Sequence, residues 1–371
     1  GDPLIGGAEE TARKLVEIFP DMDLAETTAF LEAGRAGYIR RRLLPSDANR
    51  VRDLGEIALE LPHERDRFYP QGTMAAHVLG YVASDGAGRV GMEAALDERL
   101  MDPAMRGRPA MLSIDMRVQG ALEDELRRGM LAVNALGAAG IVLDVDSGEV
   151  LAMASLPEFD PNRVKPSDVL LPEGAPAGAT PPAFNRVTNQ VYELGSTFKP
   201  LTVAAAIDAG VVTDMGRRYA ADPVKIGGAT IKDSHSMGAT LNVAETLIHS
   251  SNTVTARIAD ELGGKAMKRT MSDLGMDDRP YIELPARGAP IWPSGEWPRL
   301  RNMTVGFGHG IAVTPLHLAS AYAAMVNGGI WRPSTLHKLA PGTVPKGRRV
   351  FKASTSARMN QLLRMIALYG T

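Results

Sequence analysis

The sequence predicts a protein of two domains, the larger of which is a mixed α+β domain. The chain has 371 residues, which is more than a typical single domain contains. A short strand, an amphipathic helix and a hairpin follow one another in residues 111–154, and this order favours a largely antiparallel sheet flanked by helices. Just before them, Gly107-Arg108-Pro109 interrupts regular structure. We therefore expect one domain over residues 1–109 and a second over residues 110–371.

The first hundred residues are rich in charge and in helix-forming residues. A helix is predicted from Ala8 to Phe19, where Pro20 stops it, and a second one from Asp23 to Ala33. The sequence Asp85-Gly86-Ala87-Gly88 predicts a turn, and Gly91 to Asp97 is again helical in pattern. Short helices are thus the main elements that we expect in this part.

The second part begins with a predicted strand, Met111–Asp115, and an amphipathic helix from Arg117 to Leu136. Apolar residues recur every four positions in that helix, which gives it one apolar stripe. A hairpin is predicted from Ala139 to Ala154, with Asp146-Ser147-Gly148 as its turn, because glycine adopts the positive φ that such a turn requires. The stretch 160–182 is rich in Pro, Gly and Ala, so we expect a long loop there.

Composition excludes several classes of function. The formal net charge is −2 and no basic stripe is present, so we expect no nucleic-acid partner. A chain without cysteine forms no disulfide and no thiolate metal site, and no two histidines have the spacing of metal ligands. No apolar stretch approaches the roughly 18 residues that span a bilayer. Because residue 1 is Gly rather than Met, we expect the natural N-terminus to lie upstream.

One segment has the pattern of an activated serine. Gly195-Ser196-Thr197-Phe198-Lys199-Pro200 leads into an apolar helix that Gly210 ends. Ser196 and Lys199 are three positions apart, so they lie on one helical face. A buried lysine with a lowered pKa can take the proton of a serine hydroxyl, and the helix N-terminus can stabilise an oxyanion. Taken alone, the pattern also fits a surface Ser beside a surface Lys, but here an apolar helix follows the lysine.

A second candidate is Ser250-Ser251-Asn252, the only Ser-x-Asn sequence in the chain. It lies between two predicted helices. Asn242 and Glu245 have the pattern of the N-cap and N3 residues of the first, and the second runs from Thr253 to Leu262. Since Ser and Asn are also good helix caps, this tripeptide alone indicates no more than a cap.

The two motifs in this order resemble the penicillin-recognising serine transferases and hydrolases. The wider sequence resembles the class B penicillin-binding proteins of the division-specific type (penicillin-binding protein 3 type), over nearly the whole chain. The segments that carry the resemblance are Arg67–Pro70, Gly91–Glu93, Leu143–Ser155, Phe159–Asn162, Asn185–Arg186, Glu193–Pro200, Ser250–Asn252 and Val305–Ala319.

This resemblance implies the fold and the roles of the residues. An elongated N-terminal pedestal domain is expected before a transpeptidase domain, which has a serine β-lactamase-like antiparallel sheet flanked by helices. Ser196 is expected to be the acyl-forming nucleophile and Lys199 its general base. Ser250 is expected to relay a proton toward the leaving amine, and Asn252 to hold the substrate amide.

The resemblance also implies a reaction, partners and a location. The expected reaction is the D,D-transpeptidation of peptidoglycan, in which stem peptides ending in D-Ala-D-Ala are cross-linked through a serine acyl-enzyme during septal wall synthesis. β-Lactams are expected to acylate the same serine. The expected partner is a membrane glycosyltransferase of the division machinery. The chain is expected to be the periplasmic part of a single-pass inner-membrane protein, with its anchor upstream of residue 1 and with no metal or organic cofactor.

The family's third motif, Lys-(Ser/Thr)-Gly on an edge strand, does not occur in the sequence. Residues from Ala357 to Thr371 resemble the helix that leads up to it, so we expect the motif to follow Thr371. Two alternatives stay open. One is an elongation-specific class B enzyme with the same chemistry, and the other is a non-catalytic sensor or scaffold that keeps the fold.

Overall fold

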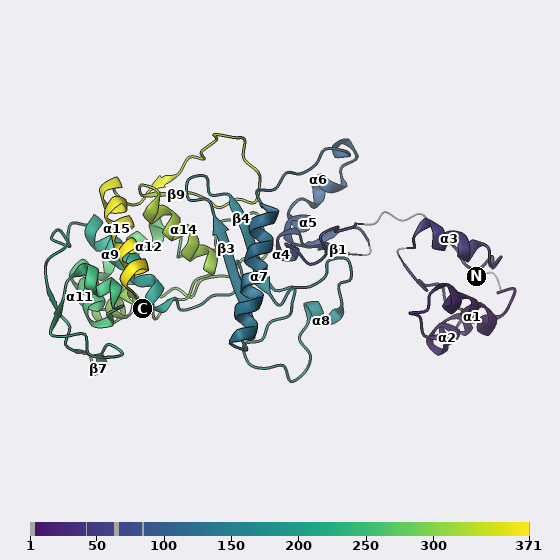
Figure 1. Cartoon of the computed structure of the whole chain (residues 1–371), viewed down its shortest axis with the longest axis horizontal. Helices are drawn as coiled ribbons and strands as arrows, with labels where there is room; N and C mark the ends of the chain where they lie inside the picture. Colours follow the sequence, from purple (N-terminus) through teal and green to yellow (C-terminus); the bar gives the residue numbers. More distant parts are fainter. Residues whose placement is uncertain (1–3, 42, 63–66, 84, 371) are drawn as a thin grey trace. The chain divides into compact units, whose positions relative to one another are not determined.

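The computed structural model describes residues 4–41, 43–62, 67–83 and 85–370, which fall into two compact units, Gly1–Phe68 and Tyr69–Thr371. Figure 1 shows their elements along the chain. Gly1, the first residue of the first expected domain, and Thr371, the last residue of the second, lie outside the described residues. The units divide before Tyr69, whereas the sequence suggests a domain boundary at Pro109. A compact unit and a domain of a protein family need not have the same bounds, so the boundary at Pro109 stays a prediction.

The first unit is a small helical cluster. The two helices expected here are present, and their apolar faces meet around Leu15, Phe19 and Val51. Asp23, expected as the first residue of the second helix, is instead its N-cap and accepts a hydrogen bond from the backbone N–H of Glu26. The helices of this unit are α1 (Ala8–Ile18), α2 (Leu24–Glu32) and α3 (Pro45–Arg52).

The second unit begins with short elements that join its main core. Val78 and Met92 are buried in one cluster with Val150 and Met153 of the hairpin that follows later. Residues 69–101 therefore pack against the mixed domain rather than forming a core of their own. The elements are α4 (Ala76–Leu79), β1 (Tyr81–Val82), β2 (Gly88–Val90), α5 (Gly91–Ala95), α6 (Asp97–Met101) and the 3₁₀ helix η1 (Pro103–Met105).

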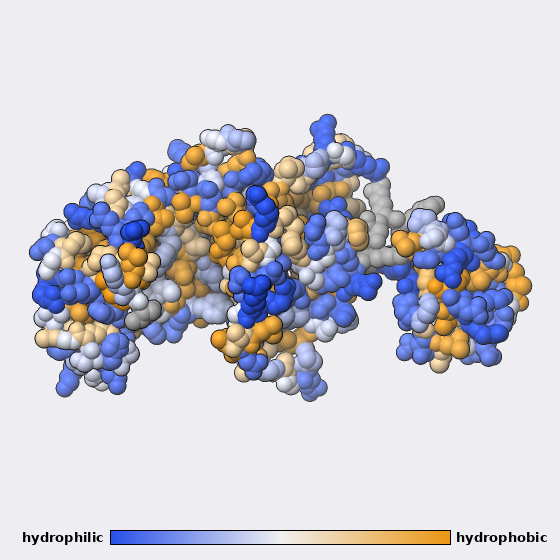
Figure 2. All heavy atoms as spheres, in the orientation of Figure 1, coloured by the Kyte–Doolittle hydropathy of each residue, from blue (hydrophilic) through white to orange (hydrophobic). Residues whose placement is uncertain are grey.

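The expected helix and hairpin form the middle of this unit. Helix α7 (Met116–Ala132) packs along the hairpin of β3 (Ala138–Leu143) and β4 (Val150–Leu156), which pair antiparallel (Figure 1). Helix α7 ends before the expected Leu136, because Asn134 has a φ of 51°, outside the right-handed helical region. Figure 2 shows apolar surface gathered over the hairpin, with hydrophilic residues around it.

The outer edge of β4 is covered by side chains and by an irregular segment. Gln119 of α7 is fully buried, and its amide both donates to the carbonyl of Met153 and accepts from the N–H of Met153, each at 2.9 Å. The strand expected at Met111–Asp115 is reduced to a single bridge between Leu112 and His337. That part of the prediction was wrong, because separate hydrogen bonds rather than a continuous ladder hold the segment on β4, among them Asp115 N–H to the carbonyl of Leu151 and Ser113 Oγ to the carbonyl of Val150.

The rest of the unit is mainly helical and surrounds one buried helix, α9 (Lys199–Asp208), in which residues 199–207 are all buried. Helices α10, α11, α12, α14 and α15 contact it. Within the described residues, no helix is long and apolar enough to cross a membrane. The remaining elements are α8 (Pro166–Val169), the 3₁₀ helix η2 (Gly195–Phe198), β5 (Tyr219–Ala220), β6 (Val224–Ile226), β7 (Ala229–Ile231), β8 (Thr240–Leu241), α10 (Val243–Ile248), α11 (Asn252–Leu262), α12 (Gly264–Asp273), α13 (Arg299–Gly306), α14 (Pro315–Val326), β9 (Ile330–Trp331), β10 (Arg348–Arg349) and α15 (Ala353–Tyr369).

Acid should weaken this unit through His77 on α4. The side chain is buried, its Nε2 lies 2.6 Å from the carbonyl oxygen of Pro182, and burial lowers its pKa from 6.5 to about 4. Between these values the unfolded chain binds a proton that the folded chain does not, so the free energy of unfolding falls as the pH falls. A shift of this size corresponds to about 3 kcal/mol. We expect His77→Gln to make denaturant unfolding less dependent on pH between about pH 7 and about pH 5.

The control is His235→Gln, because His235 is exposed in the same unit. It should leave the pH dependence of the wild-type protein in place. Equal pH dependence in the His77 variant and the wild-type protein would show that His77 does not carry the effect.

Candidate active site

Ser196 lies on a sharp turn at the start of the buried helix. The sequence predicts a helix that begins near Ser196, and the structure has the 3₁₀ turn η2 there, continued directly by α9. Gly195 adopts a φ of +56°, which turns the chain so that Ser196 is exposed while Lys199 is only 1% exposed. Pro200 sits in the first turn of α9, as expected. The hydroxyl is therefore open to solvent, and the amine behind it is not.

The Lys199 amine lies among three oxygen atoms. Its Nζ is 3.1 Å from Ser196 Oγ and 2.9 Å from Ser250 Oγ, and it also donates to the carbonyl oxygen of Ser250. Burial lowers the pKa of Lys199 from 10.5 to about 8, and the carboxylate of Asp233 acts in the opposite direction. A substantial fraction of this amine is thus neutral near pH 8, with a lone pair that can accept the Ser196 proton.

Ser250 reaches Lys199 from the connection between α10 and α11. Asn242 and Glu245 form the expected capping box of α10, and Ser251 caps α11 by accepting from the N–H of Val254 at 3.1 Å. Ser250 itself has a φ of +57°, a left-handed conformation that is costly for any residue other than glycine. This conformation ends α10 and places both the hydroxyl and the carbonyl of Ser250 on Lys199.

Asn252 is the fourth predicted residue, and it is partly exposed at the start of α11. Its Nδ2 donates to the carbonyl oxygen of Lys232 at 3.3 Å. The structure thus brings Ser196, Lys199 and Ser250 into direct contact and places Asn252 two positions beyond Ser250. The roles of these four residues stay predictions.

A glycine-rich loop supports the turn from behind. The N–H of Gly195 donates to the carbonyl of Gly308 at 3.0 Å, and the N–H of Gly310 donates to Glu193 Oε1 at 2.7 Å. A Cβ at Gly308 would lie 2.1 Å from the carbonyl oxygen of Gly195, so only glycine permits this approach. The loop leads into α14, which Thr314 caps as the sequence suggests.

Two residues that contact the site are not indicated by the sequence alone. Tyr322 of α14 donates its hydroxyl to the carbonyl of Thr197 at 2.7 Å, and burial raises its pKa to about 12, so the hydroxyl keeps its proton. Asp233, just after β7, binds the Ser250–Asn252 connection through its carboxylate. No local catalytic motif includes either residue: in the sequence Tyr322 fits an apolar helical stripe, and Asp233 is a carboxylate in a loop.

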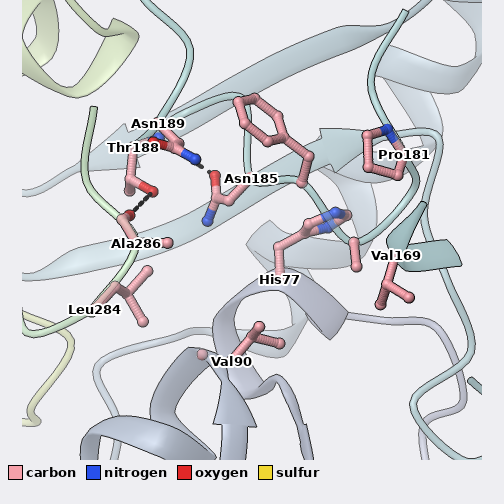
Figure 3. Close-up of a pocket in the computed structure, with 12 residues that line it drawn as sticks. His77, Val90, Val169, Pro181, Asn185, Thr188, Asn189, Leu284 and Ala286 are labelled. Carbon is pink, nitrogen blue, oxygen red and sulfur yellow. Dashed lines mark hydrogen bonds between the residues drawn. The ribbon is translucent and has the colours of Figure 1, made fainter. Parts of the chain in front are cut away.

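A cavity of about 250 Å³ lies elsewhere in the second unit (Figure 3). His77 and Val90 lie on one side of it, and Asn185 and Thr188 on the other. Thr188 donates to the carbonyl of Ala286 at 2.9 Å, and the amide oxygen of Asn185 accepts two backbone N–H groups. None of the four predicted site residues lines this cavity.

Among the described residues, no three His, Cys, Asp or Glu side chains gather in a way that could hold a metal ion. The chemistry that the arrangement supports is acyl transfer through serine. It combines an exposed hydroxyl, a buried amine in contact with that hydroxyl, and a second hydroxyl in contact with the amine.

Replacing Gly308 should displace Ser196. We expect Gly308→Ala to slow acylation of Ser196 by a fluorescent penicillin by roughly tenfold to a hundredfold, because small misplacements of a reacting group are costly. The new methyl would meet the backbone of Gly195 at 2.1 to 2.6 Å. Gly342→Ala is the matched control, since Gly342 has a similar φ of +77° and nothing within 4 Å of its Cβ position. Equal acylation rates in the two variants would show that the close approach of Gly308 to Gly195 does not position Ser196.

The strained backbone of Ser250 can be separated from its hydroxyl. Ser250→Gly and Ser250→Ala both remove the Oγ that lies 2.9 Å from Lys199 Nζ, but only glycine relieves the φ of +57°. We expect the glycine variant to be more stable than the alanine variant by roughly 1 kcal/mol in denaturant unfolding. Turnover should fall in both variants alike. An alanine variant as stable as the glycine variant would show that this conformation carries no strain.

Comparison with known proteins identifies the family. Residues 138–371 match the family of the penicillin binding protein transpeptidase domain. The chain is 38% identical over 365 residues to the probable peptidoglycan D,D-transpeptidase FtsI of Caulobacter vibrioides, covering 98% of this chain and 60% of the relative. It is 31% identical over 360 residues to the peptidoglycan D,D-transpeptidase FtsI of Escherichia coli, covering 91% of this chain and 59% of the relative.

A solved structure agrees with the sequence relatives. The apo transpeptidase (TP) domain of penicillin-binding protein 3 from Burkholderia pseudomallei is similar with a TM-score of 0.60 and 27% identity, covering 70% of this chain and 71% of that one. The chain spans about 60% of the length of the curated relatives it matches. The resemblance and the α+β fold expected from the sequence are thereby confirmed: the chain belongs to the penicillin-binding protein transpeptidase family, and FtsI proteins and a penicillin-binding protein 3 are among the proteins it is similar to.

Proposed function

We propose that the protein is a serine D,D-transpeptidase that cross-links peptidoglycan stem peptides during septal wall synthesis and that β-lactams acylate. One observation carries the proposal: the buried amine of Lys199 lies 3.1 Å from the exposed hydroxyl of Ser196. A neutral amine in that position can act as the base that the hydroxyl requires.

In the first half-reaction, Lys199 takes the Ser196 proton while Oγ attacks the carbonyl carbon of the penultimate D-Ala. The carbonyl oxygen becomes an oxyanion, and the backbone N–H of Ser196, in the first turn of the helix, can donate to it. The peptide C–N bond then breaks. Ser250, 2.9 Å from Lys199, passes the proton to the leaving D-Ala amine, and the acyl group stays on Ser196 as an ester.

In the second half-reaction, the amine of a neighbouring stem peptide attacks the ester. Its proton returns through Ser250 and Lys199 to Ser196 Oγ, and a new amide bond forms. Asn252 is proposed to bind the amide of the donor peptide, because its side chain is partly exposed beside Ser250. Every step of this proposal uses side-chain and backbone groups of the chain itself, with no metal or organic cofactor.

The domain and cellular assignments are also proposals. We assign residues 1–109 to a pedestal domain and residues 110–371 to the transpeptidase domain. We place the chain in the periplasm, anchored upstream to the inner membrane, with a membrane glycosyltransferase of the division machinery as partner. The similarity to FtsI proteins supports the division role over an elongation role. The contact between Lys199 and Ser196 supports catalysis over a non-catalytic scaffold.

The nucleophile can be tested by covalent labelling. We expect a fluorescent penicillin to label the wild-type protein at one site and Ser196→Ala to lose the label, because alanine has no oxygen that can form the ester. Intact-protein mass spectrometry and peptide mapping would locate the adduct. Ser354→Ala is the control, since Ser354 is exposed on α15, and it should label normally. Full labelling of the Ser196 variant would refute the assignment.

A further inference from the structure

The carboxylate of Asp233 makes four hydrogen bonds to one short segment. Its Oδ1 accepts from the backbone N–H of Asn252 at 2.5 Å and of Thr253 at 3.0 Å. Its Oδ2 accepts from the hydroxyls of Ser251 at 2.9 Å and Thr253 at 2.8 Å. Asp233 follows β7, a strand about twenty positions earlier in the sequence, so these bonds join two separate loops.

These bonds exceed what is needed to cap α11. Ser251 already accepts from the N–H of Val254, and its side chain is fully buried. The carboxylate instead immobilises Ser251, Asn252 and Thr253 together, while the adjacent carbonyl of Lys232 accepts from the Asn252 side chain. Ser250 directly precedes this immobilised segment in the chain.

The negative charge of Asp233 also affects the pKa of Lys199. Its carboxylate raises the Lys199 pKa and so opposes the lowering that burial causes. The other titratable side chains on the elements packed around the turn make different contacts. Glu193 accepts from Gly310 and Tyr322 donates to Thr197, while Nδ1 of His309 lies 3.2 Å from the carbonyl of Phe307.

We propose that Asp233 is a positioning residue for the acyl-transfer reaction. It holds the Ser250–Asn252 connection in place against the turn of Ser196, and its negative charge favours the protonated form of the Lys199 amine. It acts through these residues and does not itself touch the reacting atoms. This inference rests on the proposed transpeptidase function.

Two substitutions separate position from charge. Asp233→Asn keeps the shape and removes the charge, and its amide nitrogen cannot accept from the hydroxyls of Ser251 and Thr253. Asp233→Glu keeps the charge and moves the carboxylate. Asp222→Asn is the matched control, because Asp222 is an exposed carboxylate that reaches α11 only through its ion pair with Arg257.

The measurement is the rate of acylation by a fluorescent penicillin from roughly pH 6 to pH 10. In the wild-type protein the rate should fall on the acid side of about pH 8, where Lys199 becomes protonated. In Asp233→Asn this acid limb should move to lower pH, since the charge that favours the protonated amine is gone. Its plateau should also fall by roughly tenfold or more, from misplacement of Ser250 and Asn252. Asp233→Glu should lower the plateau and leave the limb near its wild-type position.

Hydrogen exchange gives a readout that does not depend on acylation. In both Asp233 variants the backbone amides of Asn252 and Thr253 should exchange faster than in the wild-type protein and in Asp222→Asn. Peptides covering residues 250–256 report this by mass spectrometry.

The outcomes separate the two proposals. An Asp233→Asn protein with wild-type plateau, acid limb and amide exchange would overturn the role of Asp233 while leaving the function intact. If the acid limb of Asp233→Asn stays at its wild-type pH, only the proposed effect of the Asp233 charge on Lys199 is overturned. A wild-type protein that takes no label at Ser196 would refute the function, and the exchange data would still decide whether Asp233 orders the connection. If Asp233→Asn does not fold, the glutamate variant carries the same plateau and exchange tests.

Discussion

The buried amine of Lys199 is the interaction on which the geometry of the site depends. A lysine that is 1% exposed would destabilise the fold by an amount of the order of several kcal/mol if its nitrogen had no partners. Its partners are the hydroxyl of Ser196 and two oxygens of Ser250, so the start of α9 must meet the connection between α10 and α11. The apolar packing of α9 on all sides then fixes where that meeting occurs.

One costly backbone conformation, that of Ser250, persists beside this amine because its surroundings hold it. Ser250 keeps a left-handed backbone because α10 and α11 are both capped and packed on either side of it. The backbones of Gly195 and Gly308 approach each other more closely than any side chain permits. Strain of this kind, of the order of 1–3 kcal/mol for each such residue, is stable only where neighbouring contacts determine the geometry, and it pre-organises a site. The carboxylate of Asp233 supplies such contacts on the Ser250 side.

The compact unit that contains the site begins at Tyr69, well before residue 110, where the sequence predicts that the α+β domain starts. Val78 and Met92 share a core with the β3–β4 hairpin, and His77 is buried against the loop that contains Pro182. A chain cut at Pro109 would therefore expose apolar surface on the hairpin side. The family match begins at residue 138, whereas the physical unit begins at Tyr69.

The sequence by itself determined the elements and the candidate residues whose signals are local. The capping box of Asn242 and Glu245, the turn at Gly148 and the paired Ser-x-x-Lys and Ser-x-Asn motifs depend only on near neighbours in the chain. The strand expected at Met111–Asp115 failed because strand formation depends on a distant partner. Only the tertiary structure decided that Ser250 meets Lys199 and that Asp233 binds the α11 start. Those contacts join residues far apart in sequence, and their formation depends on the packing of the whole core around α9.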